Sequence, residues 1–466
     1  VDDQAGEVVG KLRAISGEDW VITDPAGVAS YVKDETEHAI APMPCYDCVV
    51  VKPKDSQEIS GILKYANDEK ITVVARGGGT GCAGAVVPIK PSIIIALERL
   101  NKIVEVDDKN MMVECEAGVT LSDLEETFTH HDSLFFPVHP GDEGAQVGGM
   151  VVQNAGGVRA VRHGVMRNHI KGLEVVLPTG EIIRTGGKLM KDNTGYDLTH
   201  LMIGSEGTLG IVTKVILKLY PKTTNSGSLL ISFDDKKAAV EVVPKILREG
   251  IVPLAIEYLE RDFMLRSAED LGLQWPAQKG IVDLYFILVE PKEEDLLEIS
   301  SRIVEICEAN GAVESLIAET AKEQRAILEI RSHGYPSVKS QVVDILDVAI
   351  PVGNLSEYMN GVDELAAKYG AHIPSFGHAG DGNIHNFIMT ETGEKPDNYE
   401  ALSDDLFKLA ISLGGTITAE HGVGKIRNRK LGLQYSQKHL EIMKGIKRVF
   451  DPNNILNPGT GIGCVD

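Results

Sequence analysis

The sequence predicts an α+β protein with more than one domain, and three observations lead to this. The chain has 466 residues, 43% of them apolar, which is long for one compact domain. Up to about residue 220, glycine-rich segments separate short apolar β-runs. From Pro221 onward, apolar strands alternate with long amphipathic helices, which indicates that a second domain begins there.

The first half begins with a weak helical pattern over residues 1–40. After it, "CVVVK" predicts a strand, "SQEISGILKYANDEK" predicts an amphipathic helix capped by Asp55 or Ser56, and "ITVVAR" predicts a strand that ends on glycines. Further β-runs are "SIIIAL", "MMVECEAG", "GLEVVLPTGEIIRTG" and "GIVTKVILKLYP". We therefore expect an α+β domain with much irregular backbone.

The second half predicts strands in "SGSLLISF" and "DLYFILVE" and helices in "EEDLLEISSRIVEICEANG" and "LSEYMNGVDELAAKYG". This alternation favours an antiparallel sheet with helices on one of its faces. The tail "HLEIMKGIKRVFDPNNILNPGTG" predicts a helix followed by a coil rich in proline, asparagine and glycine.

Charge and composition narrow the class of protein. The net charge is 46 − 68 = −22, and such an acidic surface disfavours nucleic acid and anionic lipid. The sequence has no signal-peptide pattern and no apolar run long enough for a transmembrane segment, so we expect a cytoplasmic protein. The scattered cysteines argue against a disulfide framework, and one C-x-x-C pair alone is weak evidence of metal or redox chemistry; the six are Cys45, Cys48, Cys82, Cys115, Cys307 and Cys464.

The first glycine cluster, "RGGGTGCAG", matches the dinucleotide fingerprint at Gly79-x-Gly81-x-x-Gly84. A Rossmann fold needs a helix directly after these glycines, and Pro88 and Pro91 prevent one. Consecutive glycines can still direct several backbone N–H groups at one anion. The loop is therefore either an anion-binding nest or a plain tight turn.

Two more glycine clusters follow, "HPGDEGAQVGGMVVQNAGGVRAVRHG" and "LMIGSEGTLGIVT". With "ARGGGTG", "GHAGDGNIH", "EHGVGK" and "FDPNNILNPG", in this order, the chain resembles the vanillyl-alcohol oxidase / p-cresol methylhydroxylase superfamily of flavoproteins. Within it, the chain looks like the branch of glycolate oxidase flavin subunits, D-lactate dehydrogenases and D-2-hydroxyglutarate dehydrogenases, from about residue 40 to 460.

The resemblance implies a two-subdomain FAD-binding domain of the p-cresol methylhydroxylase type and an α+β cap domain with an antiparallel sheet. We expect residues 1–221 to form an N-terminal helical segment and the FAD domain, 222–425 the substrate and cap domain with a metal site, and 426–466 a segment that returns to the FAD domain.

The resemblance also implies FAD, bound without a covalent link because Thr80 stands where some relatives carry an attaching histidine. His163 stands where relatives often have tyrosine, and it is either a flavin contact or a turn residue. The cofactor-binding residues carried over from the family are Arg76, Gly77, Gly78, Gly79, Thr80, Gly81, Pro140, Gly141, Asp142, Gly148, Gly149, Asn154, Gly157, Glu206, Gly210, Ile211, Val212 and Asn457.

The segment "FGHAGDGNIH" places His378 and His385 seven positions apart. Its three glycines argue against a helix, and on a regular strand an odd spacing would turn the two rings to opposite faces; a bent, bulged strand could bring them together. Two imidazoles suit a divalent metal, and Glu420 of "TITAEHGVG" would add a carboxylate for zinc, iron or manganese. The resemblance implies the same three ligands, and the alternative is local hydrogen bonding by each histidine.

Two further residues complete the expected catalytic set. His421 follows Glu420 and would point elsewhere on extended backbone; because imidazole titrates at about pH 6.5, we expect it to act as general base, or else to orient the Glu420 loop. Arg331 of "ILEIRSHGYPSVKS" matches the family's arginine for the substrate carboxylate, and Lys339 and Lys425 are weaker candidates.

The resemblance implies an FAD-dependent 2-hydroxy-acid dehydrogenase, with oxidation of D-lactate to pyruvate as the leading reaction. The hydride would pass to flavin N5 and the electrons to an external carrier such as electron-transfer flavoprotein. The alternatives are glycolate or D-2-hydroxyglutarate as substrate, an alkylglycerone-phosphate synthase-like flavoenzyme, and a subunit that binds FAD only for assembly.

Overall fold

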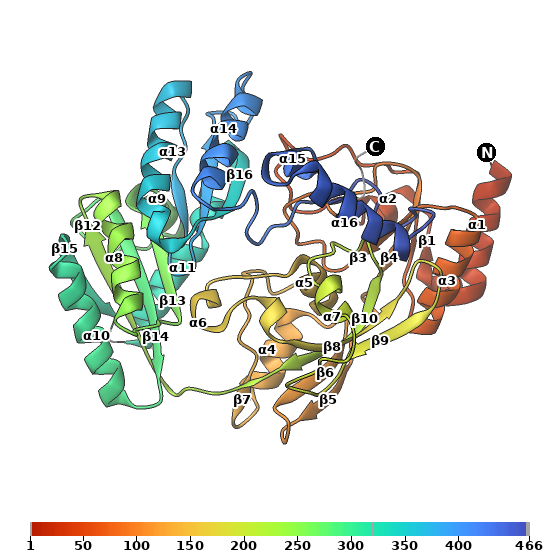
Figure 1. Ribbon diagram of the computed structural model, residues 1–466, viewed down its shortest axis with the longest axis horizontal. Helices are drawn as coiled ribbons and strands as arrows, with labels where there is room; N and C mark the ends of the chain where they lie inside the picture. The colour runs from red at the N-terminus through yellow and green to blue at the C-terminus, as the bar shows by residue number, and fades with distance from the viewer. Residues whose placement is uncertain (1, 319, 463–466) are drawn as a thin grey trace.

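A computed structural model describes residues 2–318 and 320–462, which form two lobes (Figure 1). The N-terminal lobe carries three sheets, and the other lobe carries one large sheet. The last helix, α16 (Gln437–Phe450), lies on the N-terminal lobe, and Val73 forms a parallel bridge with Leu456 just beyond it. The last described segment therefore lies beside the sheet from which the first glycine loop leaves.

The first sheet has the order β1-β2-β4-β3, with β2, β4 and β3 parallel. Helix α3 (Ser56–Asp68) joins β2 to β3, and the Asp55 side chain caps it by accepting from the N–H groups of Gln57 and Glu58. Helix α1 (Asp2–Ser16) packs against α3. The strands are β1 (Val21–Ile22), β2 (Cys48–Val51), β3 (Val73–Arg76) and β4 (Ser92–Ala96).

The loop after β3 confirms one expectation. Between β3 and β4 the chain forms no helix, so the Rossmann arrangement is absent from this described segment, as Pro88 and Pro91 predicted.

The second sheet is antiparallel, with the order β5-β6-β10-β8-β9. Helix α5 (Val147–Gln153) packs against β10 and faces the first sheet's glycine loop. The five strands are β5 (Ile103–Asp107), β6 (Met112–Glu116), β8 (Ile170–Val176), β9 (Ile182–Gly186) and β10 (Ile211–Lys218). Smaller elements of this lobe are α2 (Pro25–Ala29), α4 (Leu121–Thr129), α6 (Ala160–His163), α7 (Leu198–Met202), and the paired strands β7 (Leu134–Phe135) and β11 (Tyr220–Pro221).

The second lobe contains a seven-stranded antiparallel sheet with the order β15-β12-β14-β13-β17-β18-β16. Its strands are β12 (Asn225–Phe233), β13 (Ala255–Glu260), β14 (Val282–Glu290), β15 (Ala312–Ala318), β16 (Val342–Ala349), β17 (Ser375–His378) and β18 (Asn383–Met389). Its helices are α8 (Lys236–Arg248), α9 (Arg261–Leu271), α10 (Glu293–Glu308), α11 (Ala321–Ser332), α12 (Gly334–Val338), α13 (Leu355–Tyr369) and α14 (Tyr399–Ser412).

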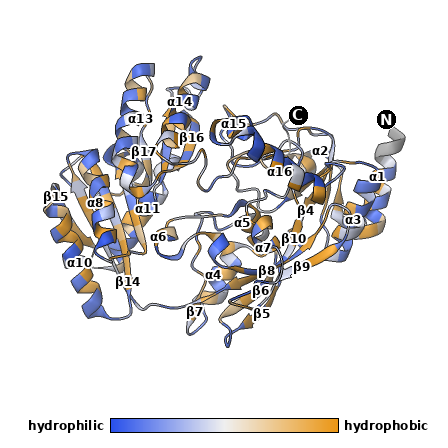
Figure 2. Ribbon diagram, in the orientation of Figure 1, coloured by the Kyte–Doolittle hydropathy of each residue, from blue (hydrophilic) through white to orange (hydrophobic). Residues whose placement is uncertain are grey.

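The expectation that helices cover one face of this sheet was wrong. Helices α8, α10, α13 and α14 bury one face, while α9, α11 and α12 pack on part of the other. The strands alternate accordingly: Leu229 and Ile231 of β12 face the first helical layer and Leu230 faces the second. Figure 2 shows apolar residues gathered along the strands and on the sheet-facing sides of the helices.

The remaining part of that second face holds polar residues instead of a helix. Strands β13, β16, β17 and β18 each carry one of these polar residues on this face. The residues are Glu257, Asp347, His378 and His385, and all are at most 6% exposed. These four side chains therefore project from the open end of the sheet, where a pocket is found. None of the described helices is both long and apolar enough to cross a membrane.

Candidate active site

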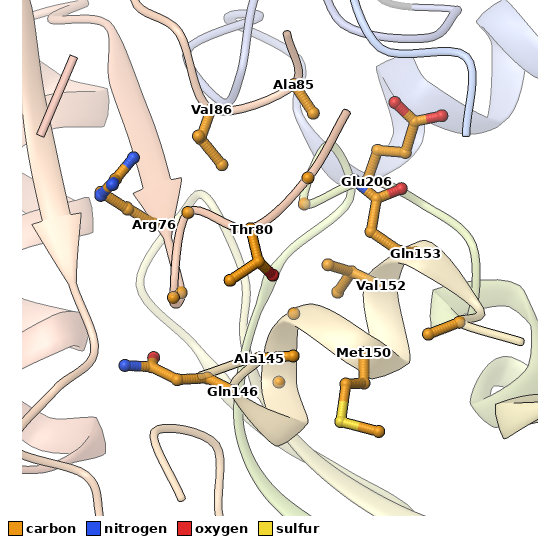
Figure 3. A pocket seen from close by; sticks show the side chains of 18 of the residues that line it. Arg76, Thr80, Ala85, Val86, Ala145, Gln146, Met150, Val152, Gln153 and Glu206 are labelled. Atoms are coloured by element: carbon orange, nitrogen blue, oxygen red, sulfur yellow. The ribbon is translucent and has the colours of Figure 1, made fainter. Parts of the chain in front are cut away.

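A large cavity lies between the glycine loop after β3 and helix α5. Thr80 stands on one side, Met150 and Val152 of α5 on the other, and Glu206 closes one end (Figure 3). The side chains of Gln146 and Gln153 flank the helix, and each has a buried Oε1 without a hydrogen-bond partner among the described residues. Buried polar atoms of this kind ordinarily have a partner, so the cavity is suited to a polar ligand.

The glycine loop itself offers backbone donors to that cavity. Within the described part of the chain, the N–H groups of residues 77–81 donate to no protein acceptor. A methyl group added at Gly81 or Gly149 would meet no atom within 4 Å, so both glycines leave space open on the cavity wall. Free N–H groups around open space form an anion-binding nest, which fits the pyrophosphate of FAD.

Close backbone packing explains several of the glycines. A Cβ at Gly78 would lie 2.3 Å from the carbonyl oxygen of Gly144, and a Cβ at Gly148 would lie 2.7 Å from the Cβ of Ala117. Gly79 has φ +76°, a conformation that favours glycine. The first contact places the loop after β3 against the segment that leads into α5, and the second places α5 against the residue that follows β6.

Most of the expected cofactor residues line this cavity. Gly141 and Gly157 line the adjoining pocket instead, and Asn154 lines neither, because it ends α5 with φ 54° and its Oδ1 accepts from the N–H of Arg167. The residues on the cavity wall are Arg76, Gly77, Gly78, Gly79, Thr80, Gly81, Pro140, Asp142, Gly148, Gly149, Glu206, Gly210, Ile211, Val212 and Asn457.

Two of these residues also hold chain segments in place. The Arg76 guanidinium donates to the carbonyl oxygen of Lys33 at 2.7 Å and packs on the Tyr31 ring, and burial lowers the pKa of Arg76. The Glu206 carboxylate accepts from the N–H groups of Val423 and Gly424 at 2.8 and 2.7 Å. Glu206 thereby fixes the loop that carries Glu420 against the cavity.

The two histidines of "FGHAGDGNIH" lie on an antiparallel hairpin, not on one bent strand. β17 and β18 are joined by a four-residue turn, and the register pairs Phe376 with His385 and His378 with Asn383. Opposite residues of an antiparallel pair project to the same face, so both histidines do as well. Their ring centroids are 5.7 Å apart.

Glu420 meets both rings. Its Oε1 lies 3.7 Å from Nε2 of His378, 3.4 Å from Nε2 of His385 and 4.0 Å from Nε2 of His421. Two ligands held at about 2.1 Å from one tetrahedral ion are about 3.4 Å apart, so these atoms are spaced as metal ligands are. Burial raises the pKa of Glu420, but the two histidines hold it well below its usual range.

A buried carboxylate stands behind each histidine. Glu257 is the cross-strand neighbour of His378 and its Oε1 lies 2.6 Å from Nδ1, whereas Asp347 is the neighbour of His385 with Oδ1 3.5 Å from Nδ1. The Glu257 carboxylate holds the Nδ1 proton of His378 and leaves its Nε2 free for a metal, whereas Nδ1 of His385 has no hydrogen-bond partner among the described residues. Burial disfavours charge on His378, yet Glu257 and Glu420 raise its pKa well above the ordinary value.

The ligand atoms can be grouped in a second way. Asp347, His385, Glu420 and His421 each bring one ligand atom within 4.8 Å of the others. Asp347 Oδ2 already accepts three backbone N–H groups, so we assign it to positioning and retain His378 as the third ligand. Both groupings are centred on Glu420 and His385.

His421 does not point away from Glu420 as extended backbone would require. The segment before it is irregular rather than a strand. The N–H groups of residues 419–421 all donate to the Asp347 carboxylate, so the backbone curves around this side chain. The His421 ring stacks on His385, with centroids 5.1 Å and planes 5° apart, and it lines both cavities. Its imidazole is therefore exposed to a ligand in either one.

The second pocket adjoins the first at Glu420 and His421, and Arg331 lies on its wall. Arg331 Nε donates to Glu257 Oε2 at 2.9 Å and its Nη2 forms a short contact with the same oxygen, while no described residue accepts from its Nη1. Lys339 does not line the second pocket, but it is paired with Glu35, which does. Lys425 donates to the carbonyl oxygens of Gly84 and Ala85, so neither lysine is near the metal-ligand cluster.

His163, also considered for the flavin, lies outside the lining of both cavities. Its ring meets those of Phe135 and Tyr220 edge-on, and burial lowers the pKa of His163 to about 4. Its surroundings are those of a packed aromatic cluster.

The C-x-x-C pair has free thiols, and burial raises the pKa of Cys48 to about 12. Cys464 lies outside the described residues.

Sequence reasoning missed Glu257 and Asp347, the two carboxylates behind the histidines. A signal was present, because each acid has apolar or aromatic neighbours on both sides, in "AIEYL" and "ILDVAI". A buried acid requires a partner, so such an acid marks a site before its partner is known. It also missed Gln146 and Gln153, whose amides carry no comparable signal.

Comparisons with known families agree with this two-lobed arrangement. Residues 48–186 match the family described as "FAD binding domain", and residues 222–460 match the family described as "FAD linked oxidases, C-terminal domain". The first match covers the glycine loop and α5, and the second covers the histidine hairpin, Arg331 and Glu420.

Individual relatives extend over nearly the whole chain. A D-lactate dehydrogenase of Archaeoglobus fulgidus is 38% identical over 430 residues, covering 92% of this chain and 95% of the relative. The glycolate oxidase subunit GlcD of Bacillus subtilis is 35% identical, covering 97% and 96%. The crystal structure of p-cresol methylhydroxylase with substrate bound superposes with a TM-score of 0.79 at 19% identity, covering 99% and 97%, which confirms the predicted fold.

Proposed function

Because the chain belongs to the family of FAD-linked oxidases, we propose that it is an FAD-dependent D-2-hydroxy-acid dehydrogenase that oxidises D-lactate to pyruvate. The relatives named above, a D-lactate dehydrogenase and a glycolate oxidase subunit, support a small 2-hydroxy acid as substrate. We choose D-lactate as the leading substrate because the relative with the higher identity, 38%, is named D-lactate dehydrogenase.

One observation carries this proposal. Glu420 and His421 line the cofactor cavity and the adjoining pocket at once, so whatever enters the pocket meets them beside the cofactor. Arg331 lies on the wall of the same pocket and supplies the cation that a substrate carboxylate needs. A base, a cation and a cofactor cavity in contact are the parts that oxidation of a 2-hydroxy acid requires.

The residues divide the work as follows. Arg331 binds and orients the substrate carboxylate, and its pairing with Glu257 holds the guanidinium in place. His421 Nε2 accepts the proton of the substrate hydroxyl as the Cα–H bond breaks. Stacking on His385 and the N–H donated to Asp347 keep the imidazole of His421 aimed at the pocket.

FAD would be held by the N–H groups of residues 77–81 and by the walls formed by α5, Glu206 and Asn457. When bound, it supplies the acceptor for the hydride that leaves Cα. A divalent cation, zinc, iron or manganese, would be held by His378, His385 and Glu420, and it lowers the pKa of a hydroxyl bound to it. We propose FAD because free N–H groups line the cavity, and the divalent cation because the side-chain atoms are spaced as metal ligands are.

For the electrons we propose an external protein carrier of the electron-transfer flavoprotein type. The net charge of −22 would suit a partner with a basic docking surface. The test is D-lactate-dependent reduction of a terminal dye with and without that carrier. Reduction that is equally fast without the carrier would contradict this part of the proposal.

The reaction itself is tested by anaerobic mixing of the flavin-loaded protein with D-lactate or L-lactate. We expect D-lactate to bleach the flavin absorbance near 450 nm with one pyruvate formed per flavin, and L-lactate to bleach it at least about 100-fold more slowly. His421→Asn should slow bleaching by about 100-fold or more, within the range for loss of a general base. A flavin that no 2-hydroxy acid reduces would refute the proposal.

A further inference from the structure

The end of the second pocket that lies away from Arg331 limits which 2-hydroxy acids can bind. We infer that a hydrogen-bonded pair, Glu37 and Tyr335, closes this end and selects short 2-hydroxy acids with an uncharged side chain against 2-hydroxy dicarboxylates. The inference rests on the proposed function, since it takes the substrate's 1-carboxylate to lie at Arg331.

The pair joins the two lobes. Tyr335 lies on α12 of the cap lobe, and its hydroxyl donates to Oε1 of Glu37 at 2.5 Å, across 298 positions of sequence. Glu37 is 9% exposed, and both residues line the pocket. The segment that carries Glu37 is tied to the cofactor loop, because the N–H of Glu35 donates to the carbonyl oxygen of Gly81 at 2.9 Å. The carboxylate is therefore held in place at the pocket's end.

The charges on the pocket wall do not suit a second carboxylate. Arg331 is the one lysine or arginine among the described residues that line this pocket, and Glu257 already shares its guanidinium. Against it stand five acidic side chains on the lining: Glu35, Glu37, Asp142, Asp344 and Glu420. Among these acids, Glu35 is already paired with Lys339 and Asp344 with Arg427. The distal carboxylate of a dicarboxylate would therefore have no unpaired cation there, and it would approach Glu37.

The space between Arg331 and Glu37 is lined by apolar and aromatic side chains. Phe376 and Phe387 stack with centroids 4.8 Å apart, and Tyr335 lies 6.4 Å from Phe387. Ile345 and Ile40 complete this part of the wall. A methyl or ethyl group is stabilised by burial on such a surface, and a charged group is not.

The test compares D-lactate with D-2-hydroxyglutarate in the flavin-loaded protein. For the wild type we expect kcat/KM for D-lactate to exceed that for D-2-hydroxyglutarate by at least about 100-fold, because an unpaired charge would be buried. Glu37→Gln keeps the size of the side chain and removes its charge, so the ratio should fall at least about tenfold. Tyr335→Phe keeps the Glu37 charge, so the ratio should not fall.

A matched pair of controls exists on the cap lobe. Tyr369 donates its hydroxyl to Oδ2 of Asp405 at 2.7 Å, and neither residue lines either of the two pockets described above. Asp405→Asn and Tyr369→Phe make the same chemical changes outside the site, and both should leave the substrate ratio within twofold of the wild type. FAD content and thermal unfolding identify any variant that does not fold.

Failure of this inference and failure of the proposed function give different results. A wild type that oxidises both acids within tenfold of each other, or Glu37→Gln with an unchanged ratio, overturns the inference while the proposed function stands. If no acid reduces the flavin, the proposed function fails. The inference is then tested by the dissociation constants of pyruvate and 2-oxoglutarate, measured from flavin difference spectra. Constants within tenfold of each other overturn the inference, and pyruvate at least about 100-fold tighter supports it.

Discussion

Asp347 is the residue whose change should reveal most about how the site is built. It lies on β16, 3% exposed, and its Oδ2 accepts the N–H groups of Ala419, Glu420 and His421 at 3.0, 2.9 and 2.8 Å. Its Oδ1 accepts from the Asn383 side chain at 2.8 Å. One carboxylate thus shapes the loop that presents both the expected metal ligand and the expected base.

Asp347→Asn keeps the shape and removes the charge. Asparagine retains one oxygen and presents an NH₂ group where the second oxygen was, so donors on one side lose their acceptor. A hydrogen bond to a charged group contributes about 1.5–3 kcal/mol, and an unsatisfied buried donor costs about 1–3 kcal/mol. We expect the free energy of unfolding to fall by about 2–4 kcal/mol at pH 7 and metal affinity to fall about 10–100-fold.

The pH dependence has a definite sign. Burial raises the pKa of Asp347, but His421, His385 and the loop N–H groups lower it, and the net shift is below the ordinary value. A depressed carboxyl pKa stabilises the folded state above the ordinary value of about 3.9, and this stabilisation is lost as the pH falls through the folded pKa. The difference between wild type and Asp347→Asn should therefore be full at pH 7 and shrink at pH 4 and below.

Urea unfolding at pH 7 and pH 3 measures the free energy, and calorimetric titration with Zn²⁺ or Mn²⁺ at pH 7 measures metal affinity. Asp405→Asn, at an exposed salt bridge with Lys368, is the control and should change the stability by less than about 1 kcal/mol. A change below about 0.5 kcal/mol in Asp347→Asn, with unchanged metal affinity, would refute the role given to this carboxylate.

Three further predictions concern other parts of the site. Gly78→Ala places a Cβ 2.3 Å from a backbone carbonyl oxygen, so FAD should bind about 10–100-fold more weakly by flavin fluorescence, whereas Gly432→Ala, with nothing within 4 Å, should not change it. Arg331→Lys should raise KM for D-lactate about 10–100-fold in steady-state assays with a smaller change in kcat, because an ammonium lacks the guanidinium fork. Glu257→Gln should lower the free energy of unfolding by about 3–5 kcal/mol in urea, since it leaves Arg331 and His378 without their buried partner.

The strands and the glycine loop were predictable because their causes are local. "CVVVK", "ITVVAR" and "SIIIAL" are apolar runs bounded by turn residues, and each is a strand. Pro88 and Pro91 act on their own backbone, so the exclusion of a helix after the glycines needed no knowledge of tertiary contacts. The second helical layer on the cap sheet was missed, although β12 and β14 carry successive buried residues, which is typical of strands covered on both faces.

The histidine pair was found, but its geometry was not. Residues seven apart on one strand face opposite ways, and the four-residue turn that sets the register of β17 against β18 was not recognised. Asn154 differs from its expected place: the motif predicts it near the cofactor, and its left-handed conformation at the end of α5 directs the side chain to the N–H of Arg167. Both outcomes depend on backbone geometry that residue types alone do not specify.

The positions of the carboxylates Glu257 and Asp347 beside the histidines could be recognised only once the strand order of the sheet was known. Their partners lie 121 and 38 positions along the chain, and only the strand order β13-β17-β18-β16 makes them neighbours. Cross-strand pairing of this kind is set by topology, not by local sequence.

The central claim is that one site joins an FAD cavity to a metal-assisted base at His421. Its most direct test is anaerobic stopped-flow reduction of the flavin by D-lactate and by α-deuterated D-lactate, in metal-replete and chelator-treated protein. We predict reduction with a primary deuterium isotope effect, slowed about 100-fold or more by the chelator without loss of FAD, and restored by Zn²⁺ or Mn²⁺. Reduction at the same rate after the metal has been removed would contradict the account.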